Sequence, residues 1–361
     1  MFSPAILLSL VLGALAFTAL TAAAPLAVYT VTLALFGLAH VTSEFAYVDR
    51  RFGRRLGRPL VWRLGLLLAG VAAARAAGVF GLLPVTVALT VELALVAALA
   101  LAVAGGEGPR GLALGVALPL GLATALAPFE TAVTLAITHN FTPLGFLWEA
   151  APRHRRGPAM ALALAGFIGL PLLVASGLPR LWLGLDLAGA DPMATGGLIR
   201  HLHVYVPAAL RDGPWALDLF AACVVAQGAH YLAVIVILPA LQRRRAPGMR
   251  GLIPWPGRGL FALAVVAGSA VALIGFLDDF SGARGLYGIL ASVHAWVEIP
   301  LLVLILGGAF QPTASLPARN EAAFAAAETA SARRGVNPAT TAISPASTAT
   351  TIASRAMTDG Q

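Results

Sequence analysis

Lysine is absent from this chain of 361 residues, so all 24 basic residues are arginine. Charged residues make up only 11% of the sequence and hydrophobic residues 59%, a balance that excludes a water-soluble globular domain. The single cysteine, Cys223, lies in a hydrophobic stretch, which excludes a disulfide framework and a thiolate metal cluster. The sequence also lacks the GxxxxGKS/T, HExxH and CxxC motifs of common soluble enzymes.

Long apolar runs dominate what is present. Runs of about 20 residues recur from residue 5 to residue 308, and each can cross a hydrocarbon core of about 30 Å as a helix. We therefore predict an all-α, polytopic transmembrane bundle of about ten helices. Their expected ranges are 5–24, 26–48, 61–80, 83–104, 111–127, 129–150, 158–178, 216–240, 258–277 and 286–308.

The two ends of the chain differ in composition. The first apolar run has no basic region before it and no convincing cleavage site after it, so we predict a retained first helix and not a removed signal peptide. Residues 1–309 are expected to form one transmembrane helical domain. Residues 310–361 are rich in Ala, Ser, Thr and Pro, which predicts a disordered cytoplasmic tail.

The arginines gather in short segments between the apolar runs, as topology determinants do, and this pattern argues against nucleic acid as a partner despite the net charge of +8. With ten crossings and residues 49–60 on the cytoplasmic side, 15 arginines lie inside and 4 outside. We expect both termini in the cytoplasm and the protein in a bacterial inner membrane; merging two pairs of helices would keep this orientation. Arg75 and Glu92, on consecutive helices, are expected to form a structural ion pair.

Four histidines lie near the middle of four separate predicted helices: His40, His139, His230 and His294. An ionisable ring at bilayer depth is costly and usually functional. At a helical rise of about 1.5 Å per residue the four positions differ in depth by roughly 10 Å, which helix tilt and side-chain reach can close. We predict that the four rings meet at one metal site; packing or hydrogen bonding of individual rings is the alternative.

Carboxylates accompany two of these histidines. Glu44 follows His40 by four residues, and Glu298 follows His294 by four, which puts each pair on one helix face. Each carboxylate is predicted to be a metal ligand or to accept a hydrogen bond that fixes the tautomer of a ligating imidazole.

Other polar residues are candidates for supporting roles. Gln227 and Asn140 lie close in sequence to cluster histidines and are expected in a second layer of contacts around the metal. Residues 179–215 form one long external segment, which is a possible lid. Its His201 and His203 would face the same side if the segment were extended, where they could bind metal, although a surface loop is the simpler interpretation.

Imidazole and carboxylate ligands suit iron, copper or zinc. The sequence favours a non-haem iron oxidoreductase that acts on a lipophilic substrate, such as a carotenoid, a quinone or a lipid, which enters from the bilayer. A stacked pair of haems would need two histidines on each of two helices, whereas each helix here supplies one. A single haem b for electron transfer, another transition metal, and a proton- or cation-coupled transporter with His and Glu along its path are the alternatives.

The run FGLAHVTSE around His40 resembles the early Pro-His-Gly helix motif of the Brp/Blh family of membrane β-carotene dioxygenases, with Ala39 in place of proline and Val41 in place of glycine. The three later histidines could match that family's later histidine positions, although its closely paired histidines in a late helix are absent. The resemblance implies a multi-helix bundle, a non-haem iron held by intramembrane histidines, and cleavage of a carotenoid to retinal.

Overall fold

The computed structural model describes residues 4–105, 108–245 and 250–310, and within these ranges the chain is all-α. The predicted tail, 310–361, lies outside the described residues except for Phe310, which is buried in the core. The first part of the bundle consists of α1 (Pro4–Ala23), α2 (Pro25–Phe52), α3 (Arg58–Val79), α4 (Val85–Ala102), α5 (Arg110–Leu126), α6 (Pro128–His139) and α7 (Pro143–Ala150). The rest consists of α8 (Arg156–Leu164), α9 (Leu170–Ala175), α10 (Leu178–Leu183), α11 (Leu198–Tyr205), α12 (Ala208–Arg211), α13 (Ala216–Leu232), α14 (Leu238–Arg245), α15 (Arg258–Asp278) and α16 (Phe280–Leu306).

Within the described residues, seven helical segments are long and apolar enough to cross a membrane. The segment of α15 shows what this implies: its mean hydropathy is 2.5, yet only 6% of its most apolar window is buried inside the protein. Such an apolar and exposed helix is stable only against lipid, because water-soluble proteins rarely expose large apolar patches. The chain is therefore an integral membrane protein. α1 and α5 contain shorter apolar helices.

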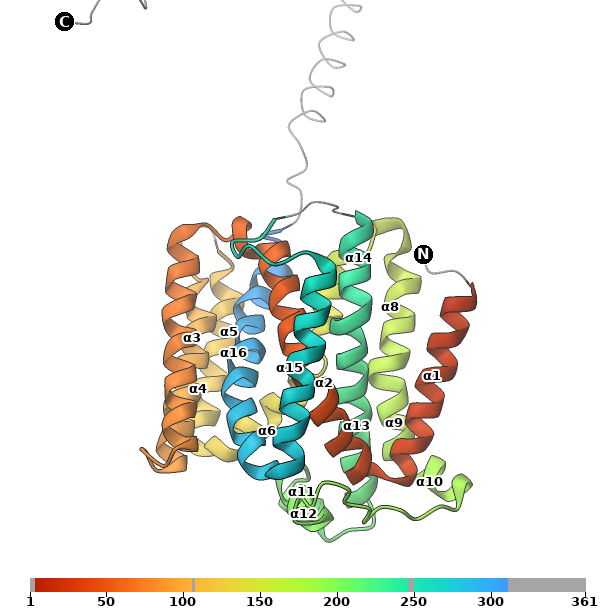
Figure 1. Ribbon diagram of the computed structural model, residues 1–361. Coiled ribbons are helices and arrows are strands. Elements are labelled where there is room, and N and C mark those ends of the chain that lie inside the picture. The colour runs from red at the N-terminus through yellow and green to blue at the C-terminus, as the bar shows by residue number, and fades with distance from the viewer. Residues whose placement is uncertain (1–3, 106–107, 246–249, 311–361) are drawn as a thin grey trace, which may run out of the picture. The chain divides into compact units, whose positions relative to one another are not determined.

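Helices α2, α13 and α16 form the interior of the bundle, between α3, α4 and α5 on one side and α1, α8 and α9 on the other (Figure 1). Burial follows this arrangement: 56 to 61% of the most apolar window is buried in the three segments that contain these helices, against 39% or less in the other four spans. The helices with the most protein contact are thus the ones that can position a site away from lipid.

The helix predicted over residues 129–150 is two helices, α6 and α7, separated by residues 140–142. Pro143 starts α7 and cannot donate a backbone hydrogen bond to the preceding turn. Side chains satisfy the carbonyl groups at the end of α6: Asn140 Nδ2 donates to the carbonyl oxygen of Ile137 at 3.1 Å, and Thr142 Oγ1 donates to that of His139 at 2.6 Å. A broken helix at membrane depth needs such internal partners.

Two other predicted helices are continuous but widen for one turn. The π-helical turns Ala165–Gly169 and Ala233–Ile237 join α8 to α9 and α13 to α14. Pro171 and Pro239 follow these turns, and a proline removes a donor and clashes with the carbonyl four residues before it. The second widened turn begins three residues after His230.

One end of the bundle is a core of closely packed hydrophobic side chains, which we call the closed half. Its fully buried side chains include Phe52, Phe146 and Leu301, and the rings of Phe52 and Phe146 lie 6.0 Å apart. At the same end Arg51 forms a bidentate pair with Glu149, at 2.7 and 2.9 Å.

The segment predicted as one long loop, 179–215, contains the short helices α10, α11 and α12, which lie at the opposite end of the bundle (Figure 1). Asp191 orders the loop before α11, because its carboxylate accepts hydrogen bonds from the backbone N–H groups of Thr195 and Gly197 at 2.8 and 3.0 Å. These bonds lower the pKa of Asp191 against the opposing effect of burial. His201 and His203 lie in neither an extended strand nor an irregular surface loop, because both are on α11.

Candidate metal centre

The four predicted histidines converge. His40 lies on α2, His139 at the end of α6, His230 on α13 and His294 on α16. One ring nitrogen from each lies within 4.8 Å of those of the other three. Their separation of roughly 10 Å in depth, expected from sequence, is closed by the bundle, in which the helix carrying His139 ends at the cluster.

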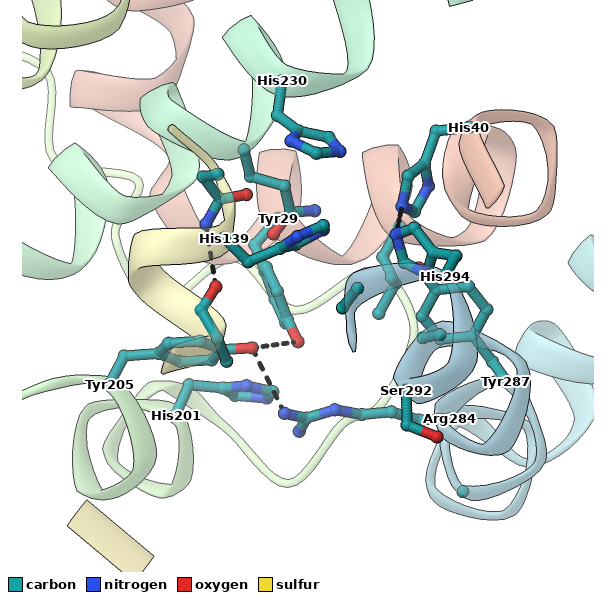
Figure 2. Close-up of a pocket in the computed structure, with 18 of the residues that line it drawn as sticks. Tyr29, His40, His139, His201, Tyr205, His230, Arg284, Tyr287, Ser292 and His294 are labelled. Atoms are coloured by element: carbon teal, nitrogen blue, oxygen red, sulfur yellow. Dashed lines mark hydrogen bonds between the residues drawn. The ribbon is translucent and has the colours of Figure 1, made fainter. Parts of the chain in front are cut away.

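The rings surround one point (Figure 2). Neighbouring ring centroids are 4.7 Å apart for His40 and His294, 4.9 Å for His294 and His139, 4.5 Å for His139 and His230, and 5.4 Å for His230 and His40. Tyr231 stacks on the His40 ring at 4.3 Å, which fixes the plane of that ring. Histidine rings that only filled core space would not need to aim nitrogen atoms at one another.

The nitrogen positions fit a transition metal. The Nε2 atoms of His40 and His294 lie 3.0 Å apart, within hydrogen-bond distance of each other. The same distance separates adjacent ligands of an octahedral ion with metal–nitrogen bonds of about 2.1 Å. Nε2 of His139 and both ring nitrogens of His230 are buried without a hydrogen-bond partner among the described residues. Buried polar atoms are normally satisfied, and a bound ion would satisfy these.

The carboxylates lie behind the rings. Glu298 Oε2 is 2.5 Å from His139 Nδ1, and Glu44 Oε2 is 3.4 Å from His230 Nε2. Both carboxylates are almost fully buried, at 0 and 1% exposure. The sequence pairs each Glu with the histidine on its own helix, whereas the structure pairs each with a histidine on another helix. The contact to His139 fixes its Nδ1 and leaves Nε2 free to face the centre of the cluster.

The remaining predicted site residues lie around the cluster in different roles. Gln227 donates a hydrogen bond to the Tyr231 hydroxyl at 3.0 Å and so supports the ring that stacks on His40. Asn140 caps α6, as described above. His201 is buried and bonds Thr195 Oγ1 at 2.9 Å, whereas His203 is exposed, because residues two apart on a helix point in different directions.

A cavity of about 470 Å³ reaches from the four histidines to α11 and is within the range of small-molecule sites. It exists partly because α16 presents a line of small side chains to it, at positions spaced as on one helix face. These are Gly285, Gly288, Ala291, Ser292 and Ala295.

Polar aromatic residues in the cavity were missed from sequence. Four of the chain's five tyrosines line it: Tyr29, Tyr205, Tyr231 and Tyr287. Figure 2 shows the four histidine rings on one side of the cavity, with Tyr205, His201 and Arg284 on the other. The rarity of tyrosine in this sequence was the signal that could have identified them.

The ion pair predicted between Arg75 and Glu92 is present at 2.7 Å, next to the cavity. Trp296 Nε1 also donates to the same Glu92 oxygen at 2.8 Å. The Glu92 carboxylate thereby accepts two hydrogen bonds, and these contacts link α3, α4 and α16 beside the histidines.

No protein-family model, no curated protein and no solved structure matches this chain. The candidate function therefore rests on the geometry of the site.

Proposed function

We propose that this chain is a membrane-embedded metalloenzyme, a non-haem iron oxidoreductase whose ion is bound by His40, His139, His230 and His294. The convergence of one nitrogen from each ring within 4.8 Å is the observation that supports this function. Metal–imidazole bonds of about 2.0–2.1 Å place two ligand nitrogens at most about 4.2 Å apart. The ring nitrogens reach that separation if the rings move inward by less than about 1 Å.

The carboxylates support the same proposal as orienting groups. Glu298 accepts a hydrogen bond from His139 Nδ1–H, which leaves the lone pair of Nε2 free to bind a metal, and this arrangement is typical of ligating histidines. Glu44 lies 3.4 Å from the other type of ring nitrogen, Nε2 of His230. Two buried acids also lower the net positive charge of an ion held by four neutral rings, so the closed half stabilises the loaded site.

Iron is the ion that we favour, because an all-imidazole set with open coordination positions suits redox chemistry with dioxygen. Bound iron would supply that chemistry, while the protein supplies the cavity that brings the substrate to it. The resemblance of the His40 region to the membrane β-carotene dioxygenases agrees with iron and with a substrate drawn from the bilayer. Ten crossings with both termini in the cytoplasm, in a bacterial inner membrane, complete the proposal.

A haem is a poorer fit to this site. Two axial histidines would place a porphyrin between them, and the porphyrin would occupy the space around the iron in its plane. The other two histidines hold nitrogens within 4.8 Å of the first two, inside that space. Four converging rings thus replace the macrocycle as the source of nitrogen ligands.

Transport is the second candidate, favoured by the broken helix α6–α7 at the cluster, since interrupted helices form ion sites in many transporters. The packing of the closed half argues against it. The cavity reaches from the histidines to α11, and Phe52 and Phe146, at 0% exposure, fill the bundle on the other side.

The decisive experiment measures metal content and the absorption spectrum of detergent-purified full-length protein. We expect one iron per chain, no Soret band, and loss of the iron in His139→Ala. His203→Ala is the matched control, because His203 is exposed on α11 and should leave the iron in place. Equal metal in wild type and His139→Ala would overturn the four-histidine site. A Soret band would assign the protein to the haem class, and ion flux in proteoliposomes that stops in His40→Ala would assign it to the transporters.

A further inference from the structure

The cavity carries unbalanced positive charge at the end opposite the histidines. Three arginines line it, Arg75, Arg200 and Arg284, and no aspartate or glutamate does among the described residues. Glu92 neutralises Arg75. Arg200 is exposed at the mouth, and its closest polar contact is the carbonyl oxygen of Thr195 at 3.5 Å. Two cations are thus left without a counter-charge in one cavity.

Arg284 is half-buried and lines the cavity without a carboxylate partner among the described residues. Arg51 and Arg180 each form a bidentate pair with a carboxylate. Arg284 has no carboxylate within 4 Å in the described parts of the chain, and instead donates to the Tyr205 hydroxyl at 3.3 Å. Its guanidinium lies 5.9 Å from the centre of the Tyr29 ring and 6.0 Å from that of Tyr205.

Arg284 is the fifth residue of α16, and the N-cap residue Asp279 places a carboxylate at the amino-terminal end of that helix. Asp279 does not line the cavity. The aromatic faces of two tyrosines stabilise a half-buried guanidinium only in part. An anion in the cavity would interact favourably with the Arg284 side chain.

The two tyrosines leave a hydrogen-bond donor free. Tyr29 and Tyr205 hydroxyls lie 3.0 Å apart. Arginine can only donate, so the Tyr205 oxygen accepts from Arg284, and one of the two phenolic protons makes the bond between the tyrosines. The other phenolic proton has no acceptor among the described groups, although Tyr29 is only 2% exposed. A buried free donor beside an unpaired guanidinium is a ready partner for an oxyanion.

We infer that Arg284, Tyr29 and Tyr205 bind an oxyanion, a carboxylate or a phosphate, and that this group belongs to the substrate. Its position opposite the histidines would direct the rest of the substrate towards the metal, so this second step rests on the proposed function. A plain hydrocarbon such as β-carotene would leave Arg284 unpaired, whereas an amphiphile with an anionic head group would pair with it. His201, beside Tyr29, stays neutral, because burial and then Arg284 lower its pKa to about 4.

The test measures binding of three probes to full-length protein in a non-ionic detergent by titration calorimetry, in the presence and absence of added iron. The probes are inorganic phosphate, octanoate and, as the uncharged counterpart, octanol. We expect saturable binding of at least one anion and none of octanol at the same site. Arg284→Gln should weaken anion binding roughly 10-fold to 100-fold, because a buried charge-assisted contact is lost.

Arg211→Gln is the matched control, since Arg211 lies at the same end of the bundle on α12, does not line the cavity and donates to the backbone of His203.

Tyr29→Phe is a second test variant, which can be used if Arg284→Gln does not fold. It removes one hydroxyl without changing the charge and should weaken anion binding several-fold. Tighter binding of octanoate than of phosphate supports an amphiphilic substrate; the reverse supports a water-soluble anion. Binding that is equal in wild type, Arg284→Gln and Tyr29→Phe overturns the inference. The titrations without iron test anion binding by itself, so a failure of this inference can be distinguished from a failure of the metal site.

Discussion

The two halves of the bundle, which meet at the histidines, differ in the polar side chains that they contain. The closed half holds the carboxylates Glu44 and Glu298 in a packed aromatic core, each against a histidine. The other half, which we call the cavity half, holds arginines and tyrosines around open space. Acidic side chains thus lie behind the rings and basic side chains in front of them. This difference indicates that the closed half orients the ligands and the cavity half receives the substrate.

Breaking the packing of the closed half should have the largest effect on stability. Phe146 is fully buried and packs between Tyr47 and Phe52, with ring centroids at 5.8 and 6.0 Å. Phe146→Ala should lower the free energy of unfolding by about 3–5 kcal/mol, because it removes a large buried ring and leaves a cavity. Denaturant unfolding in detergent micelles measures this change. Ser292→Ala, in the cavity half, is the control and should cost far less, since open space already adjoins Ser292.

The two carboxylates sharpen the comparison, because they differ in their contact with the histidines. Glu298 lies 2.5 Å from His139, whereas Glu44 lies 3.4 Å from His230. Glu298→Ala should reduce iron affinity about 10-fold to 100-fold, as loss of an orienting partner usually does. Glu44→Ala should reduce iron affinity less. A competition titration with a chelator measures the affinity of both variants. If Glu44→Ala removed the iron completely and Glu298→Ala did not, Glu44 would be a direct ligand.

The histidine cluster could be predicted from sequence because it depends on features that a sequence contains. Each helix is marked by an apolar run, and each histidine interrupts such a run near its middle. Convergence then follows if the helices pack together, which α2, α13 and α16 do as the most buried spans. The spacing of four between His40 and Glu44 correctly places both on one face, but it suggests the wrong partner, because the contact to Glu44 comes from His230 on α13.

The cavity half could not be predicted to the same extent, since it depends on contacts between segments far apart in the chain. Tyr29 and Tyr205 are 176 residues apart and meet only because α11 folds back onto the end of α2. Arg284 would be read from sequence as an external topology residue, and nothing local shows that it lacks an acid. The break between α6 and α7 is an intermediate case: Pro143 was a local signal for it, but the long apolar run concealed the break.

The smallest expected effect is a pH dependence confined to the cavity half. Burial and the neighbouring guanidinium of Arg284 lower the pKa of His201 to about 4, against the opposing charge of Asp191, whereas the unfolded chain has a histidine pKa near 6.5. Between these values the unfolded state binds more protons than the folded state, so stability rises with pH. The stability that a neutral His201 gives the folded state is therefore fully present above about pH 6.5. It falls as the pH is lowered and stops falling below about 4.

Thermal unfolding of wild type and His201→Gln between these two pH values measures this effect, because glutamine can keep a contact to Thr195 without titrating. The fall in midpoint on acidification should be shallower in His201→Gln, and parallel curves would show that His201 does not contribute to it. His203→Gln, on the exposed face of α11, should follow the wild-type curve and thereby restrict the effect to the ring that contacts the cavity.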